Sequence, residues 1–178
     1  MDDLIYNQTK IPKEQWRYGL RSSAATGCGW IATYNALRLM GYRPKQEDLI
    51  RYFERQFPLV HGNAGTLGQG PALFFQKHGF SVETLSVTEK YDAVAKEADV
   101  CILFYYWQRK LKFGAHFVTV QWQDGKFTGY NTYKTSDGPD HYGASLEGYI
   151  KQHKFYGSFL IAIKDKRNAR SQSDPCGR

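Results

Sequence analysis

The sequence has few cysteines and no long apolar run, and both absences narrow the classes of protein to which it can belong. Its 178 residues contain three cysteines, Cys28, Cys101 and Cys176, with no CxxC pair and no Cys/His spacing typical of a metal site. An odd number of cysteines is unusual for a disulfide framework and favours a reducing compartment. No stretch reaches the roughly 18 apolar residues that span a bilayer. The acidic start, Met1-Asp2-Asp3, is unlike a signal peptide, although a leader already removed would leave no trace.

We therefore expect a cytoplasmic protein that uses no cofactor, no metal and no membrane partner. The sequence also lacks an internal repeat and a Pro/Ser-rich linker, so we expect one domain over residues 1–166. The formal charge is +7, but residues 164–178 hold five basic and two acidic residues, which leaves a net charge of +4 for the rest. No basic cluster with interleaved aromatic residues is present, so we expect no nucleic-acid partner. Residues 167–178 are predicted to be a basic, flexible tail that the domain does not need.

Helical and strand patterns divide the chain in sequence order. Apolar spacing, capping residues and glycine stops predict helices at about 28–40, 44–57, 71–78, 89–96 and 146–152. Alternation and continuous apolar runs predict strands at 80–87, 100–107, 115–123, 126–133 and 157–164. Residues 1–20 are predicted to form an irregular arm. Because helices come first and strands follow, the sequence predicts an α+β fold with an N-terminal helical layer packed on an antiparallel β-sheet.

Cys28 is the first candidate for chemistry. It ends a segment of small residues and lies at or near the start of the first predicted helix. The unpaired N–H groups and the dipole at a helix N-terminus stabilise a thiolate, which is the nucleophilic form of cysteine. Gly27 and Gly29 are expected to leave room beside it for a substrate backbone. The alternative is a small cysteine buried in the core, which is a common place for a free cysteine.

The second candidate is a histidine in a predicted hairpin. Asp124-Gly125 between two apolar runs is a strong signal for a two-residue turn. That turn places Val118 opposite Asn131 and puts His116 diagonal to Asn131 on one face of the sheet, with Cα atoms about 7–8 Å apart. A side-chain hydrogen bond between them would orient His116 as a general base. The alternative is a structural histidine with satisfied hydrogen bonds.

Five blocks of the sequence together resemble the family-39-like cysteine peptidases, a papain-like group that includes bacteriocin-leader peptidases. The resemblance covers about residues 11–165. Departures are Trp30, where the family usually has proline, and Asn131-Thr132, where many members have Asp-Pro. In chain order the blocks are Ile11-Pro12-Lys13-Glu14-Gln15, Thr26-Gly27-Cys28-Gly29, Gly65-Thr66-Leu67 with His78-Gly79-Phe80, Ala115-His116-Phe117-Val118-Thr119-Val120 with Asp124-Gly125, and Tyr130-Asn131.

The resemblance implies a thiol hydrolase that cleaves a peptide or amide bond through a Cys-His-Asn triad. In this interpretation Cys28 is the nucleophile, His116 is the general base and Asn131 orients the imidazole. The Cys28 backbone N–H and the Gln15 side chain are the expected donors to the oxyanion. Trp30 is expected to narrow the cleft. The expected partner is a peptide or amide substrate, whose identity the sequence does not specify, and the oligomeric state is equally unspecified.

Other functions stay open at this point. The same cysteine and histidine can serve an acyltransferase or a deamidase, and a papain-like domain can be a binding module without catalysis. A phosphate-binding loop at 65–70 is disfavoured, because the glycines are not followed by the Lys-Ser/Thr of a P-loop. The aromatic residues 104–107 suit either a buried strand or the floor of a substrate groove.

Overall fold

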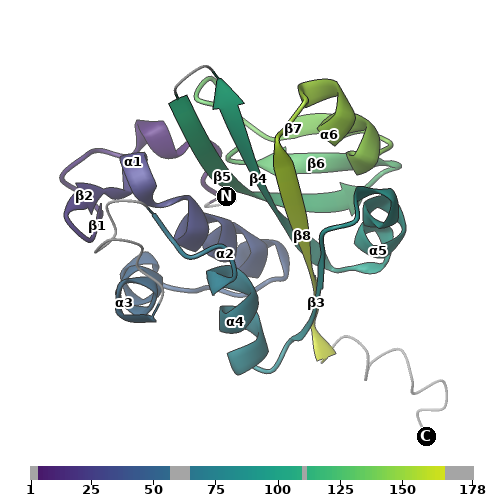
Figure 1. Ribbon diagram of the computed structural model, residues 1–178. Coiled ribbons are helices and arrows are strands. Elements are labelled where there is room, and N and C mark those ends of the chain that lie inside the picture. Colours follow the sequence, from purple (N-terminus) through teal and green to yellow (C-terminus); the bar gives the residue numbers. More distant parts are fainter. Residues whose placement is uncertain (1–3, 57–64, 110–111, 167–178) are drawn as a thin grey trace, which may run out of the picture.

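A six-stranded antiparallel sheet forms the centre of the molecule, with helices against both of its faces (Figure 1). The computed structural model describes residues 4–56, 65–109 and 112–166. The predicted tail at 167–178 lies outside these ranges. The α+β class with a helical layer on an antiparallel sheet is thereby confirmed.

The sheet has the strand order β3-β8-β4-β5-β6-β7, and every neighbouring pair is antiparallel. A separate two-stranded ribbon pairs β1 (Arg17–Tyr18) with β2 (Arg21–Ser22). The strands of the main sheet are β3 (Ser81–Leu85), β4 (Val100–Arg109), β5 (Lys112–Gln123), β6 (Lys126–Tyr130), β7 (Asp140–Gly143) and β8 (Gly157–Lys164). The closing strand β8 lies between β3 and β4, so the first and the last strand of the main sheet pair at one edge of it.

The β5–β6 hairpin has the predicted register. Asp124 and Gly125 both have positive φ, 51° and 74°, as a two-residue hairpin turn requires. Val120 pairs with Gly129, and Thr119 pairs with Tyr130. The predicted extension of the second strand to residue 133 is wrong, because β6 ends at Tyr130 and Asn131 has a φ of 65°. This left-handed conformation, which asparagine tolerates better than most residues, turns the chain out of the strand.

The first helical layer packs on the face of the sheet that carries Ile102 and Phe117. Its central helix, α2, lies along β5 and β4, and the buried Thr119 hydroxyl donates to the Ala32 carbonyl at 2.9 Å. A short 3-10 helix, η1 (Gln8–Lys10), precedes this layer in the N-terminal arm. The α-helices of the layer are α1 (Ser23–Thr26), α2 (Cys28–Leu39), α3 (Gln46–Gln56) and α4 (Gly70–Lys77).

A second helical layer covers the opposite face, which carries Leu103 and Val118. It consists of α5 (Tyr91–Glu97), which follows the 3-10 turn η2 (Thr88–Lys90), and α6 (Leu146–His153). Alternate side chains of β4 and β5 therefore belong to two separate apolar cores, one on each face of the sheet. Within the described ranges, no helix is both long enough and apolar enough to cross a membrane.

Candidate active site

Cys28 is the first residue of α2, directly after the N-cap Gly27. The first hydrogen bond of the helix runs from the Ile31 N–H to the Gly27 carbonyl at 3.0 Å. The glycines beside Cys28 serve packing, because a Cβ on Gly27 would lie 2.6 Å from Trp30 Nε1 and one on Gly29 would lie 2.5 Å from Thr66 Oγ1. The protein itself thus fills the space that these glycines were expected to leave for substrate.

The surroundings of the Cys28 thiol act on its ionisation in opposite directions. Burial raises the pKa of the thiol, while the backbone N–H groups of Phe117, Gly29 and Cys28 itself oppose that rise by stabilising a thiolate. Burial also raises the pKa of Tyr18 and Tyr105, and negative charge on Cys28 adds to both shifts. Because burial is the largest influence on the thiol, Cys28 needs a base to form a thiolate near neutral pH.

His116 lies on β5, one residue before Phe117. The N–H of Phe117 belongs to the peptide group that joins it to His116, so the Cys28 sulfur lies against the His116–Phe117 peptide group. His116 itself is half-buried, and its ring centroid is 6.0 Å from that of Tyr105, its partner across the β4–β5 ladder. The structure therefore places the predicted nucleophile against the β5 main chain next to His116, while the His116 ring lies on the Tyr105 side of the strand.

The hydrogen bond made by His116 defines its tautomer. Its Nε2 atom is 2.6 Å from the main-chain carbonyl oxygen of Asn131. A carbonyl oxygen only accepts, so Nε2 carries the hydrogen and Nδ1 of the neutral ring is left as the proton acceptor. Burial lowers the pKa of His116, and the bond to Asn131 opposes that shift. His116 is therefore held as a neutral imidazole near pH 7, the form that accepts a proton.

Asn131 contacts His116 in a different way from the one predicted. Its carbonyl oxygen, and not its side-chain amide, meets the imidazole. The amide is held instead by Gln8: Asn131 Oδ1 accepts from the Gln8 backbone N–H at 2.8 Å, and Asn131 Nδ2 donates to Gln8 Oε1 at 3.0 Å. The physical reason is the positive φ of Asn131, which takes its side chain off the face of the sheet that carries His116.

Gln15, the predicted oxyanion donor, lies in an exposed turn in which its N–H donates to the Pro12 carbonyl at 3.0 Å. The glutamine that reaches the candidate site is Gln8, which is buried and whose Nε2 also donates to the Ala24 carbonyl at 3.2 Å. Sequence reasoning missed Gln8 because it assigned residues 1–20 to an irregular arm. Its only local signal is the amide pair Asn7-Gln8 after the apolar Leu4-Ile5.

Trp30 does not narrow a cleft. It is fully buried in the first core, and its Nε1 donates to Ser23 Oγ at 3.1 Å. The aromatic run on β4 divides between the two faces of the sheet, with Tyr105 buried beside His116 and Tyr106 exposed on the other face. Phe104 stacks on Phe159 with ring centroids 4.7 Å apart, and both half-buried rings pack against the core that Cys28 also joins. These two rings provide an apolar surface on the Cys28 side of the sheet.

Two hollows in the surface do not identify the site. One of about 410 Å³ is lined by Leu37 and His78, at the far end of α2 from Cys28, and another of about 350 Å³ lies along α3. Among the residues that the structure describes, no group of three or more His, Cys, Asp or Glu side chains is arranged to hold a metal ion. The candidate site is therefore defined by the chemistry around Cys28 and not by the volume of a cavity.

Comparisons with known proteins give little further information. No protein-family model matches the chain, and no curated protein matches its sequence. Among solved structures, the chain is similar to the peptidase domain of Streptococcus ComA, a bi-functional ABC transporter involved in a quorum-sensing pathway. The TM-score is 0.48 and the sequence identity is 15%, over 76% of this chain and 90% of that one. At this identity few residues are shared, so the site has to be interpreted from its own geometry.

Proposed function

We propose that the chain is a papain-like cysteine hydrolase that cleaves a peptide or amide bond. Cys28 is the nucleophile, His116 is the general base and general acid, and Asn131 orients His116 through its main-chain carbonyl. Papain-like architecture is part of the proposal, because a helix that starts at the cysteine packs on an antiparallel sheet that carries the histidine. We also expect no cofactor to take part in the reaction.

One observation carries the proposal: the Cys28 sulfur lies against the peptide group of His116 and Phe117, while His116 Nε2 is occupied by the Asn131 carbonyl. A nucleophile, an adjacent base and a third group that orients the base are the parts of an activated thiol site. A structural histidine would need only the hydrogen bond to Asn131. A structural core cysteine would not need to begin a helix beside the histidine.

The reaction follows from these positions. Nδ1 of the neutral His116 takes the proton of the Cys28 thiol, and the sulfur attacks the acyl carbon of the substrate. The C–N bond then breaks as Nδ1–H donates its proton to the leaving amine, which leaves a thioester on Cys28. His116 then takes a proton from a water molecule, and the resulting hydroxide attacks the thioester. The C–S bond breaks, the acid leaves, and His116 returns the proton to the Cys28 sulfur. The Cys28 backbone N–H is the proposed donor to the oxyanion, and a role for Gln15 as a second donor stays a prediction.

The acyltransferase, the deamidase and the inactive binding domain differ from the peptidase in what they do with a peptide. The test is incubation of the chain with a complex peptide mixture, with and without an added primary amine, followed by mass spectrometry. We expect new peptide termini in the absence of the amine. Mass gains that require the amine would identify an acyltransferase, and gains of about one mass unit at glutamine or asparagine would identify a deamidase.

The control for this experiment is the Cys28→Ala variant, checked for folding by circular dichroism. New peptide termini that require Cys28 support the proposal. The proposal is overturned if the wild-type chain gives the same peptides as Cys28→Ala, because the domain would then bind without catalysis or use another site.

A further inference from the structure

The N-terminal arm, residues 5–10, is bonded both to the nucleophile helix and to the segment that orients the base. On one side, the Ile5 N–H donates to Asn35 Oδ1 at 2.9 Å, and Asn35 Nδ2 donates back to the Ile5 carbonyl at 2.8 Å. Asn35 belongs to α2, the helix that starts at Cys28. Three residues further along the arm, Gln8 makes the matching pair of bonds with Asn131. Two reciprocal amide pairs therefore connect the elements that carry the proposed catalytic residues.

The bonds between Gln8 and Asn131 occupy both polar atoms of the Asn131 side chain. Asn131 Oδ1 accepts from the Gln8 N–H, and Asn131 Nδ2 donates to Gln8 Oε1. Asn131 is 2% exposed and Gln8 is 9% exposed, so water does not readily replace these partners. With φ at 65° and the amide fixed, the Asn131 carbonyl is left to accept from His116.

The same Gln8 side chain also touches the segment before the nucleophile. Its Nε2 donates to the Ala24 carbonyl at 3.2 Å, and Ala24 lies in α1, four residues before Cys28. Gln8 thus contacts the peptide segments on both sides of the site without contacting the reacting atoms themselves. A buried glutamine used only to close a loop would not need partners on both segments.

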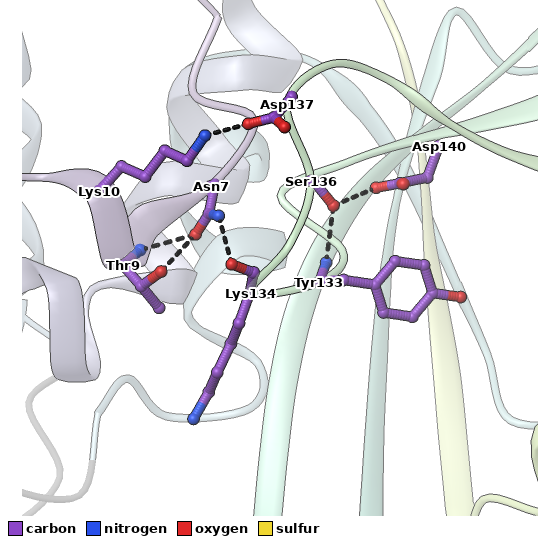
Figure 2. A network of polar contacts seen from close by, with 8 residues as sticks. All are labelled: Asn7, Thr9, Lys10, Tyr133, Lys134, Ser136, Asp137 and Asp140. Atoms are coloured by element: carbon purple, nitrogen blue, oxygen red, sulfur yellow. Dashed lines mark hydrogen bonds and ion pairs between the residues drawn. The ribbon is translucent and has the colours of Figure 1, made fainter.

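Outer contacts hold the arm against the loop that follows Asn131. In Figure 2 the Asn7 amide lies between η1 and that loop: its Oδ1 accepts from Thr9, and its Nδ2 donates to the Lys134 carbonyl at 2.7 Å. Lys10 forms an ion pair with Asp137 at the surface, where both side chains are largely exposed. These contacts lie beside the Gln8–Asn131 pair but do not touch Asn131, so they supply a matched control.

We propose that Gln8 is a positioning residue for His116. By holding the Asn131 amide, it fixes the carbonyl that keeps the hydrogen on Nε2 and leaves Nδ1 to accept the thiol proton. This inference rests on the proposed hydrolase function. It adds Gln8, one residue of the N-terminal arm, to the residues that set the activity of the site.

The test compares Gln8→Met with Lys10→Gln in two measurements. Methionine has nearly the length of glutamine but offers neither a strong donor nor a strong acceptor. The first measurement is the His116 tautomer, obtained from the ¹⁵N chemical shifts of its ring. The second is the rate at which iodoacetamide alkylates Cys28 at pH 7. For Gln8→Met we expect a mixed tautomer and an alkylation rate reduced by about 10- to 100-fold, as when a partner that orients a histidine is lost elsewhere. For Lys10→Gln we expect both values to be unchanged.

An unchanged tautomer and rate in folded Gln8→Met would overturn the inference. If Gln8→Met does not fold, Gln8→Glu decides the question, because its carboxyl still accepts from Asn131 Nδ2. We then expect Gln8→Glu to keep the Nε2–H tautomer, and its loss would overturn the inference. Failure of the hydrolase proposal gives a different result: in the wild-type chain, iodoacetamide would alkylate Cys28 no faster than Cys101. The two failures can be told apart because the His116 tautomer does not depend on the reactivity of Cys28.

Discussion

The start of α2 and the start of β4 each hold a cysteine, and the surroundings of the two thiols differ. Cys101 is 1% exposed in the second core, and burial alone raises the pKa of its thiol far above the usual range. Burial also raises the pKa of Cys28, but there the backbone N–H groups of Phe117, Gly29 and Cys28 oppose the rise. Of these two cysteines, Cys28 is the one beside the His116–Phe117 peptide group, and the His116 ring donates to the Asn131 carbonyl.

This difference is the basis on which we propose that Cys28 is activated and Cys101 is not. Burial by itself disfavours the charged form and makes a cysteine inert. A helix N-terminus supplies N–H groups that stabilise the thiolate, and a neutral imidazole supplies the acceptor for its proton. Cys28 has the helix N-terminus and, in the proposed site, the imidazole, whereas Cys101 has neither a helix N-terminus nor a pKa influence other than burial.

The largest expected effect is the contrast between Cys28→Ala and Cys101→Ala in hydrolysis rate and in free energy of unfolding. Cys28→Ala should lower the rate of peptide hydrolysis on the order of 10⁴-fold or more, because the nucleophile is lost. Its free energy of unfolding should change by less than about 1 kcal/mol, since the residue is only half-buried.

Cys101→Ala should show the reverse pattern, with unchanged hydrolysis and a loss of about 1–2 kcal/mol in unfolding free energy from the cavity in the second core. Peptide assays and urea titrations of the two variants check this pair of predictions. Equal loss of activity in both variants would mean that activity follows stability and not the Cys28 site.

A smaller effect is expected at Asn131, and it distinguishes the main-chain carbonyl from the side-chain amide. Asn131→Gly keeps the carbonyl and tolerates the φ of 65°, whereas Asn131→Ala keeps the carbonyl but strains that conformation. Both lose the bonds to Gln8. We expect Asn131→Gly to lower kcat/KM by about 10-fold and Asn131→Ala to lower it further, with both retaining more activity than Cys28→Ala. A greater loss in Asn131→Gly than in Asn131→Ala would contradict this account of the site.

The smallest of these effects is the dependence of the reaction on pH. Burial lowers the pKa of His116 from its usual 6.5, so the ring takes up a proton only at a more acidic pH. Protonated His116 does not accept the thiol proton. The kcat/KM for hydrolysis should therefore hold nearly constant from pH 8 to pH 7 and fall as the pH drops below about 6.5, with a midpoint below that value. A midpoint clearly above it would mean that another group controls the reaction.

The sequence predicted the parts of the site that depend on local chemistry. Asp124-Gly125 set the hairpin register, and the small-residue segment before Cys28 set the start of α2. The orienting contact was harder to predict, because the Asn131 side chain is bonded to Gln8, which is 123 residues away in the chain. No pattern of spacing reports such a contact.

The remaining differences in the fold have similar causes. The strand β7 (Asp140–Gly143) lies within a segment rich in turn residues, where strand propensity is low, and it forms by pairing with β6 across a bulge. The helices α5 and α6 were predicted individually. Their position on the face opposite α2 follows from the alternation of side chains along β4 and β5, a property of the assembled sheet.

The most direct test of the central claim is the alkylation rate of Cys28 relative to that of Cys101, measured at pH 7 by iodoacetamide labelling and peptide mass mapping. It is compared between the wild-type chain and His116→Gln, with circular dichroism to confirm folding. The account predicts that Cys28 reacts far faster than Cys101 in the wild type. It also predicts that His116→Gln lowers the alkylation rate of Cys28 by about 10²–10⁴-fold, the usual contribution of a positioned base. Equal rates for the two cysteines, or a Cys28 rate unchanged by His116→Gln, would contradict the assignment of Cys28 and His116 as nucleophile and base.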